Sequence, residues 1–219
     1  MNFDWSVVWR NADALLEGIE LTVLLAVTTM VISIPGGIVL ALMRLSNVRA
    51  LSAASAAFVE LFRNLPLILV VYSAYYVMPV ATGLNLSALT TGIVALSLNV
   101  SAYNGETFRA GIASIRKGQT DAAYALGMGR WQTMKEIVLP QAVRRVLPVL
   151  ASTWVSLFKD TSLVSVISVG ELAYASMRIR AQTFRVLEML TAMAAIYWLL
   201  GYPQAKLVDW INRRYGVTE

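Results

Sequence analysis

The sequence predicts an all-α membrane protein with about five transmembrane helices, and three observations lead to this class. Of its 219 residues, 58% are hydrophobic and only 14% are charged. Its mean hydropathy is +0.63, whereas a soluble domain has about 45–50% apolar and about 25% charged residues. Apolar stretches also recur along the chain, with lengths that suit membrane-spanning helices of about 20 residues.

The residue types that are missing exclude several classes of function. The chain has 0 Cys and 0 His, so it contains no disulfide, thiolate nucleophile, Cys/His zinc site or imidazole base. It also lacks the phosphate-binding pattern GxxxxGK[ST]. We therefore expect no cofactor or metal on this chain. Its net charge of +5 fits the positive-inside rule of membrane proteins better than nucleic-acid binding.

The first predicted span covers residues 19–43, where apolar residues run almost without a charge. Pro35–Gly37 lies inside it, and such residues are tolerated in membranes where neighbouring helices satisfy the freed backbone groups. Ahead of this span, Trp5 and Trp9 stand about one helical turn apart. That spacing predicts a short amphipathic helix lying on the outer membrane surface.

The second and third spans are predicted from one long uncharged run. No charged residue occurs from Asn64 to Gly105, and this run is too long for one span. Turn-forming residues divide it at Pro79–Ser87. We therefore expect spans at residues 51–78 and 88–112.

The chain then changes character at residues 114–145, which are basic and amphipathic. Apolar residues here keep helical spacing, as expected of a helix outside the bilayer: Ala122, Leu126, Met134 and Val138. Two further spans are predicted at residues 146–169 and 187–207, the first of which is interrupted by two charged residues.

The distribution of Lys and Arg predicts the orientation, with the N-terminus outside and the C-terminus inside. In that orientation, Arg10, Arg178, Arg180 and Arg185 face outward, a mild exception to the positive-inside rule. Eleven of the 18 basic residues face the cytoplasm: Arg44, Arg49, Arg116, Lys117, Arg130, Lys135, Arg144, Arg145, Lys206, Arg213 and Arg214.

Ionisable residues inside predicted spans are candidates for a transport pathway, because a charge at the centre of a membrane helix costs roughly 2.5–3.5 kcal/mol. Either they contact a substrate, or they form structural ion pairs such as Glu60–Arg63 and Glu106–Arg109. Adjacent Lys159 and Asp160 point about 100° apart on a helix and cannot both face lipid. The candidate pathway set, with polar neighbours, is Arg63, Asn64, Asn99, Tyr103, Glu106, Lys159, Asp160, Thr161 and Ser162.

A spaced motif in the loop at residues 114–145 carries a family resemblance. DAA at Asp121–Ala123 is followed by three residues and Gly127, then by nine residues and IVLP at Ile137–Pro140. This pattern resembles the EAA loop of membrane subunits of ABC importers, with Asp in place of Glu. The small residues would let the helix approach a partner closely. The resemblance implies an ATPase-coupling helix that includes Asp121, Ala122, Ala123, Gly127, Leu139 and Pro140.

The resemblance extends along most of the chain, to the polar amino acid permeases of the histidine, glutamine and glutamate/aspartate uptake systems. The strings that carry it are FRNLPL (Phe62–Leu67), AYNGETFRAGI (Ala102–Ile112), GQTDAAYALGM (Gly118–Met128), LPQAVRRVLP (Leu139–Pro148) and FKDTSLVSVIS (Phe158–Ser168). FDWS near the N-terminus and VLALMRLS (Val39–Ser46) are most similar to glutamate/aspartate permeases.

The resemblance implies the type I ABC importer permease fold and a multi-subunit complex in the bacterial inner membrane. A second permease subunit, identical or homologous, would complete the pathway. Two ATPase subunits would bind ATP and Mg²⁺, and an extracytoplasmic protein would deliver the substrate. The chain itself would not be an enzyme.

Other functions remain open from the residues alone. The substrate is glutamate or aspartate, or another polar or basic amino acid or amino-acid derivative. A stand-alone channel or secondary transporter would have more spans or an inverted repeat, and neither is visible. A membrane-embedded enzyme fits poorly, because His, Cys and a G-x-S-x-G elbow are all missing.

Overall fold

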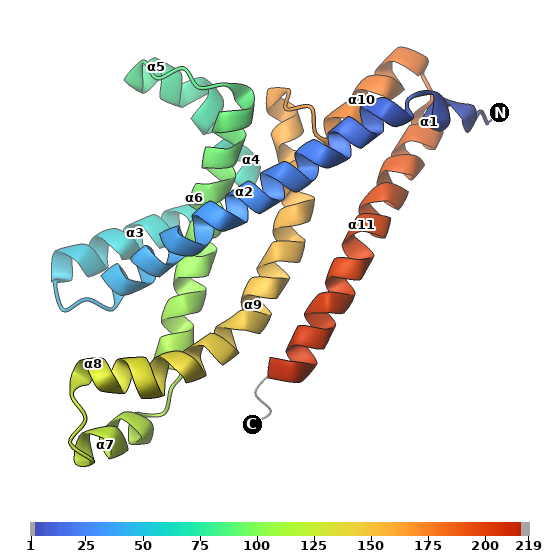
Figure 1. Ribbon diagram of the computed structural model, residues 1–219. Helices are drawn as coiled ribbons and strands as arrows, with labels where there is room; N and C mark the ends of the chain where they lie inside the picture. Colours follow the sequence, from blue (N-terminus) through green and yellow to red (C-terminus); the bar gives the residue numbers. More distant parts are fainter. Residues whose placement is uncertain (1–2, 216–219) are drawn as a thin grey trace.

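The computed structural model describes residues 3–215, which form helices joined by short connections and contain no strand (Figure 1). In chain order the helices are α1 (Ser6–Arg10), α2 (Ala12–Arg44), α3 (Arg49–Asn64), α4 (Leu67–Tyr72), the π-helix η1 (Ser73–Val77), α5 (Met78–Thr82), α6 (Ala88–Ala113), α7 (Lys117–Ala125), α8 (Arg130–Thr133), the π-helix η2 (Met134–Val138), α9 (Leu139–Asp160), the 3-10 helix η3 (Thr161–Ile167), α10 (Leu172–Thr183) and α11 (Val186–Tyr215).

Two of these helices, α2 and α11, are each long and apolar enough to cross a membrane. Both extend beyond the spans predicted at residues 19–43 and 187–207. Two bent helix pairs raise the number of candidate spans to four. α6 is less apolar but has 26 residues, enough at about 1.5 Å per residue to cross a hydrocarbon core of about 30 Å. Its bounds differ by one residue from the predicted 88–112.

The span predicted at residues 51–78 is not one continuous helix, because the chain bends by 108° between α3 and the helices that follow. The bend lies at Leu65, whose φ of −84° and ψ of 136° are extended. Pro66 explains this conformation, since its ring disfavours the helical region for the preceding residue. Pro66 also lacks the N–H that would bond the Phe62 carbonyl in a helix, and the Asn99 side-chain amide donates to that carbonyl instead, at 2.8 Å.

The predicted span at residues 146–169 is also different in the structure. The helical path starts at Arg130, continues through η2 into α9, and tightens to η3 at Thr161. Lys159 and Asp160, which were expected to interrupt this span, are the last two residues of α9. The chain then bends by 49° into α10. Residues 172–183, predicted as part of an outer loop, form this helix because its apolar side is buried against α2 and α11: Leu172, Ala173, Ala175 and Ile179.

Close packing of α2 on α6 holds the centre of the molecule together. A Cβ at Gly37 would lie only 2.6 Å from the Asn104 Cβ, and one at Gly36 would lie 2.5 Å from the Ser101 Oγ. The two glycines therefore allow the helix backbones to approach, as small residues do at membrane helix interfaces. Asn104 reinforces the contact by donating its side-chain amide to the Ser33 Oγ at 3.1 Å.

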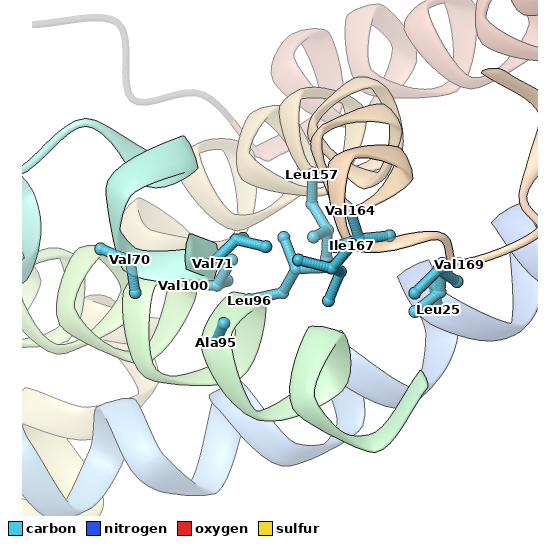
Figure 2. Packing of buried hydrophobic residues seen from close by; sticks show 10 residues of the cluster. All are labelled: Leu25, Val70, Val71, Ala95, Leu96, Val100, Leu157, Val164, Ile167 and Val169. Carbon is cyan, nitrogen blue, oxygen red and sulfur yellow. The ribbon is translucent and has the colours of Figure 1, made fainter. Parts of the chain in front are cut away.

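The largest apolar cluster lies where α2, α4, α6, α9 and η3 meet (Figure 2). Burial of each such aliphatic side chain stabilises the fold by about 1.5–3 kcal/mol relative to exposure in water. The cluster holds the C-terminal end of α9, at Leu157, against α6. This contact positions the walls of the groove between the two helices. Its buried members are Leu25, Val70, Val71, Ala95, Leu96, Val100, Leu157, Val164, Ile167 and Val169.

Candidate transport groove and coupling loop

A groove with both polar and apolar walls runs between α6 and α9 and consists of two adjoining cavities of about 410 and 510 Å³. Tyr103, Val149 and Thr153 line both cavities, so they form the wall where the two meet. The first cavity extends to the end of α9 at Asp160, and the second extends to Ser114, where the loop at residues 114–145 begins. We call them the Asp160 cavity and the loop-side cavity.

The Asp160 cavity brings together three of the predicted pathway residues, Asn99, Tyr103 and Asp160. The Asp160 carboxylate is half-buried, and no cation lies within ion-pair distance of it in the described part of the chain. Hydroxyl groups from the same face of α9 lie along the cavity at Ser152 and Ser156. This wall can accept a cationic group and hydrogen-bond a polar one. Asn99 also has the structural role described above, since its side-chain amide donates to the Phe62 carbonyl.

The loop-side cavity contains two more of the predicted residues, Arg63 and Glu106, together with Arg145, which the sequence had not singled out for the pathway. The Arg63 guanidinium lies 5.4 Å from the centroid of the Tyr103 ring, a cation–π arrangement. Glu106 accepts two hydrogen bonds from Arg109, one of them from Nε at 2.8 Å. The ion pair expected between Glu106 and Arg109 is therefore present, and it occupies both oxygens of the Glu106 carboxylate.

The remaining predicted pathway residues lie outside the groove. Lys159 and Ser162 line a separate cavity of about 350 Å³ beside α10 and α11, because Lys159 projects to a different side of α9 from Asp160. Asn64 is exposed and donates to the Glu60 carbonyl in its own helix. Thr161 is buried and donates to the Phe158 carbonyl at 2.9 Å.

Glu171, which was not among the predicted site residues, is completely buried at the N-terminus of α10. Its carboxylate accepts from the backbone N–H groups of Ala173 and Tyr174 at 2.9 and 2.8 Å, and from the Tyr197 hydroxyl at 2.9 Å. From the neighbouring helix α2, the Thr22 hydroxyl accepts a hydrogen bond from the Leu172 N–H at 3.2 Å. No N-cap signal was available in the sequence here, because the usual N-cap residues are Ser, Thr, Asp and Asn.

The loop at residues 114–145 contains two helices rather than one. Asp121, Ala122 and Ala123 lie in α7, and the chain reverses at Gly127 before α8. Leu139 and Pro140 form the first turn of α9. The loop packs on the membrane helices through an apolar cluster: Ile112, Ile115, Met134, Val138 and Ala142.

The small residues of the motif have different roles from those expected. Ala123 is buried by its own chain, whereas Ala122 is exposed. Gly127 has a φ of +81° and open space around it, so the turn requires glycine for its backbone conformation and not for close packing. Two large apolar side chains beside the turn are exposed, Leu126 at 83% and Trp131 at 76%. Figure 1 shows α7 and α8 projecting together at one end of the molecule.

Three curated relatives are similar to the chain over nearly its full length. The glutamate/aspartate import permease protein GltK of Escherichia coli O157:H7 is 37% identical, covering 97% of this chain and 98% of the relative. The glutamine transport system permease protein GlnP of Escherichia coli K12 is 33% identical, with 99% and 100% covered. The arginine transport system permease protein ArtQ of Bacillus subtilis is 34% identical, with 91% of each covered.

Solved structures agree with these relatives. An amino acid ABC transporter crystallised with histidines contains a chain with a TM-score of 0.92 and 30% identity, covering 98% of this chain and 100% of that one. A chain of the MetNI methionine ABC transporter shares the fold with a TM-score of 0.64 at 19% identity, covering 93% and 97%. The type I permease fold is therefore confirmed. The family model described as "Binding-protein-dependent transport system inner membrane component" matches residues 33–217, and the chain belongs to this family of transporter membrane subunits.

Proposed function

We propose that the chain is the transmembrane permease subunit of an ABC importer that takes up a polar amino acid, with glutamate or aspartate as the first candidates. The observation that carries this proposal is the groove between α6 and α9, which has an unpaired carboxylate at one end and guanidinium groups at the other. An amino acid carries a positive ammonium and a negative carboxylate, and the groove offers a complementary charge to each.

The charges of the groove also favour a substrate with an acidic side chain over a substrate with a basic side chain. Asp160 suits the ammonium that every amino acid carries, and Ser152 and Ser156 add hydrogen-bonding groups. At the other end, Arg63 and Arg145 suit carboxylates, because a guanidinium can hold a carboxylate through two parallel hydrogen bonds. The similarity to a glutamate/aspartate permease agrees with this choice. Glutamine and arginine, which two other relatives are named for, are the competing substrates.

The same proposal includes the partners of the chain. A second permease subunit, identical or homologous, completes the pathway, and an extracytoplasmic protein delivers the substrate. Two ATPase subunits bind ATP and Mg²⁺ and dock on α7 and α8, where Leu126 and Trp131 are exposed. The complex lies in the bacterial inner membrane, with the N-terminus outside and the loop at residues 114–145 in the cytoplasm. This arrangement needs no ATP-binding motif in the chain itself.

The direct test is uptake into proteoliposomes that contain the complex co-purified with the tagged chain. Labelled glutamate, aspartate, glutamine, arginine and histidine are compared, with and without lumenal ATP. We expect ATP-dependent uptake of glutamate or aspartate. Asp160→Asn keeps the shape of the side chain but removes the charge, so uptake should fall about tenfold or more with assembly unchanged, as for loss of a charged hydrogen bond. Asp209→Asn, at an exposed carboxylate on α11, is the matched control.

Different outcomes contradict different parts of the proposal. If no ATPase subunit co-purifies and uptake does not depend on ATP, the chain works as a channel or secondary transporter. If arginine or glutamine is the preferred substrate, the importer function stands and the acidic specificity is wrong. If Asp160→Asn lowers assembly and uptake together, Asp160 has a structural role.

A further inference from the structure

We infer that the loop-side cavity is a second, product-side binding site, in which Arg63 and Arg145 hold the carboxylate of an amino acid that has passed the Asp160 cavity. The inference rests on the proposed function, since it concerns the same substrate on the cytoplasmic side. The cavity has a volume of about 510 Å³, which is large enough for an amino acid. It opens beside Ser114, the residue that leads into the coupling loop.

The charges around this cavity favour an anion. Glu106 is the one carboxylate among the lining side chains, and Arg109 already binds both of its oxygens. No carboxylate lies within 4 Å of Arg63 or Arg145 in the described part of the chain. Two guanidinium groups therefore remain available to a ligand. The hydroxyl groups of Thr107 and Thr153 and the ring of Tyr103 complete a polar wall.

Arg145 links this cavity to the coupling loop. Its Nη1 donates a hydrogen bond to the Ser114 carbonyl at 2.8 Å, which ties α9 to the start of the loop. A second tie joins Gln141 of α9 to Gln119 of α7, at 3.4 Å between the side-chain amides. A carboxylate bound to Arg145 in the cavity would compete with the Ser114 carbonyl for the position of the guanidinium, because its N–H donors move together as one rigid plane. Occupancy of the cavity would thus alter how the loop is held on α9.

This competition predicts that the product inhibits its own uptake from the cytoplasmic side. An amino acid that accumulates inside would occupy the cavity, loosen the tie between α9 and the loop, and slow coupling to the ATPase. Arg63 holds the carboxylate but has no bond to the loop. Substituting Arg63 should therefore weaken binding of the product, whereas substituting Arg145 should weaken binding and also remove the tie.

The test uses the assembled transporter in proteoliposomes whose lumen contains ATP and graded L-glutamate. The initial rate of labelled glutamate uptake gives the lumenal concentration that halves the rate. We expect Arg145→Gln and Arg63→Gln to raise this concentration at least about tenfold, as for loss of a charged hydrogen bond. Arg144→Gln, at the neighbouring arginine that does not line the cavity, should leave it unchanged. Lumenal glutarate, which lacks the ammonium, tests whether the carboxylates suffice, and lumenal inorganic phosphate tests for a general anion site.

Several results would overturn the inference. The first is that lumenal glutamate does not slow uptake. The second is that the half-inhibitory concentrations of Arg145→Gln and Arg63→Gln lie within threefold of the value for the unmodified chain. Inhibition by phosphate at the same concentrations would replace the amino acid with an inorganic anion as the ligand and so contradict the assignment. If a variant no longer transports, equilibrium dialysis of labelled L-glutamate with the purified complex gives the same comparison. If the unmodified complex transports no amino acid at all, it is the proposed function that fails.

Discussion

Glu171 contributes to the packing of α10 through its buried carboxylate. Its carboxylate is fully buried and accepts three hydrogen bonds, two from the first turn of α10 and one from Tyr197 on α11. The backbone bonds satisfy N–H groups that every helix leaves free at its N-terminus. The bond from the Tyr197 hydroxyl joins α11 to the start of α10, across 26 residues of sequence. A single side chain therefore both begins α10 and attaches it to α11.

Substitution of Glu171 should destabilise the protein by a predictable amount. Glu171→Ala removes the cap and leaves buried donors unpaired, which should cost about 2–4 kcal/mol in the free energy of unfolding. Tyr197→Phe removes one of the three donors and should cost about 1 kcal/mol. Thermal unfolding of the purified chain in detergent, followed by size-exclusion chromatography, measures both changes. Glu17→Gln, at an exposed carboxylate on α2, is the control. Equal stability of Glu171→Ala and the control would show that the cap is unimportant.

Among the elements, helices with a continuous apolar pattern were predicted well, and those shaped by single contacts were not. Residues 88–112 matched α6 almost completely, because Ser87 caps its start and a charge-free apolar run follows. The bend at Pro66 was missed because a proline in a membrane helix is often accommodated without breaking it. The turn at Gly127 was also missed. Helical spacing continues on both sides of it, while its φ of +81° can be known only from the backbone.

The loop at residues 114–145 supports a prediction about its exposed apolar surface. Leu126 is 83% exposed, so Leu126→Asp should leave the fold intact. If Leu126 is buried against an ATPase subunit, the substitution removes about 1.5–3 kcal/mol of apolar burial and should lower capture of that subunit at least about tenfold. Pull-down with the tagged chain measures the ATPase retained. Val80→Asp, at an 88% exposed valine on α5, is a matched control at the opposite end of the molecule. Unchanged capture by Leu126→Asp would place the docking surface elsewhere.

For the whole molecule, composition and charge predicted the class of protein, while the groove required the three-dimensional arrangement. Lys159 and Asp160 are adjacent, and the sequence predicted that they point apart, yet it could not say which one faces α6. The structure separates them into different cavities because α6 packs on one side of α9 and α11 packs on another. Arg145 was counted as a charge of the loop. Nothing in the surrounding sequence shows that α9 begins before it, at Leu139.

The orientation of the whole molecule is the last prediction, and the absence of Cys makes it simple to test. Four basic residues are expected outside, which is a mild exception to the positive-inside rule and makes a direct measurement decisive. Ala81 on α5 and Ala125 on α7 are both exposed, and Figure 1 shows these helices at opposite ends. A maleimide that cannot cross membranes should label Ala81→Cys in intact spheroplasts and Ala125→Cys in inverted vesicles stripped of peripheral proteins. The unmodified chain has 0 Cys and serves as the blank. The reverse labelling pattern would mean that the N-terminus faces the cytoplasm and that α7 and α8 cannot meet a cytoplasmic ATPase.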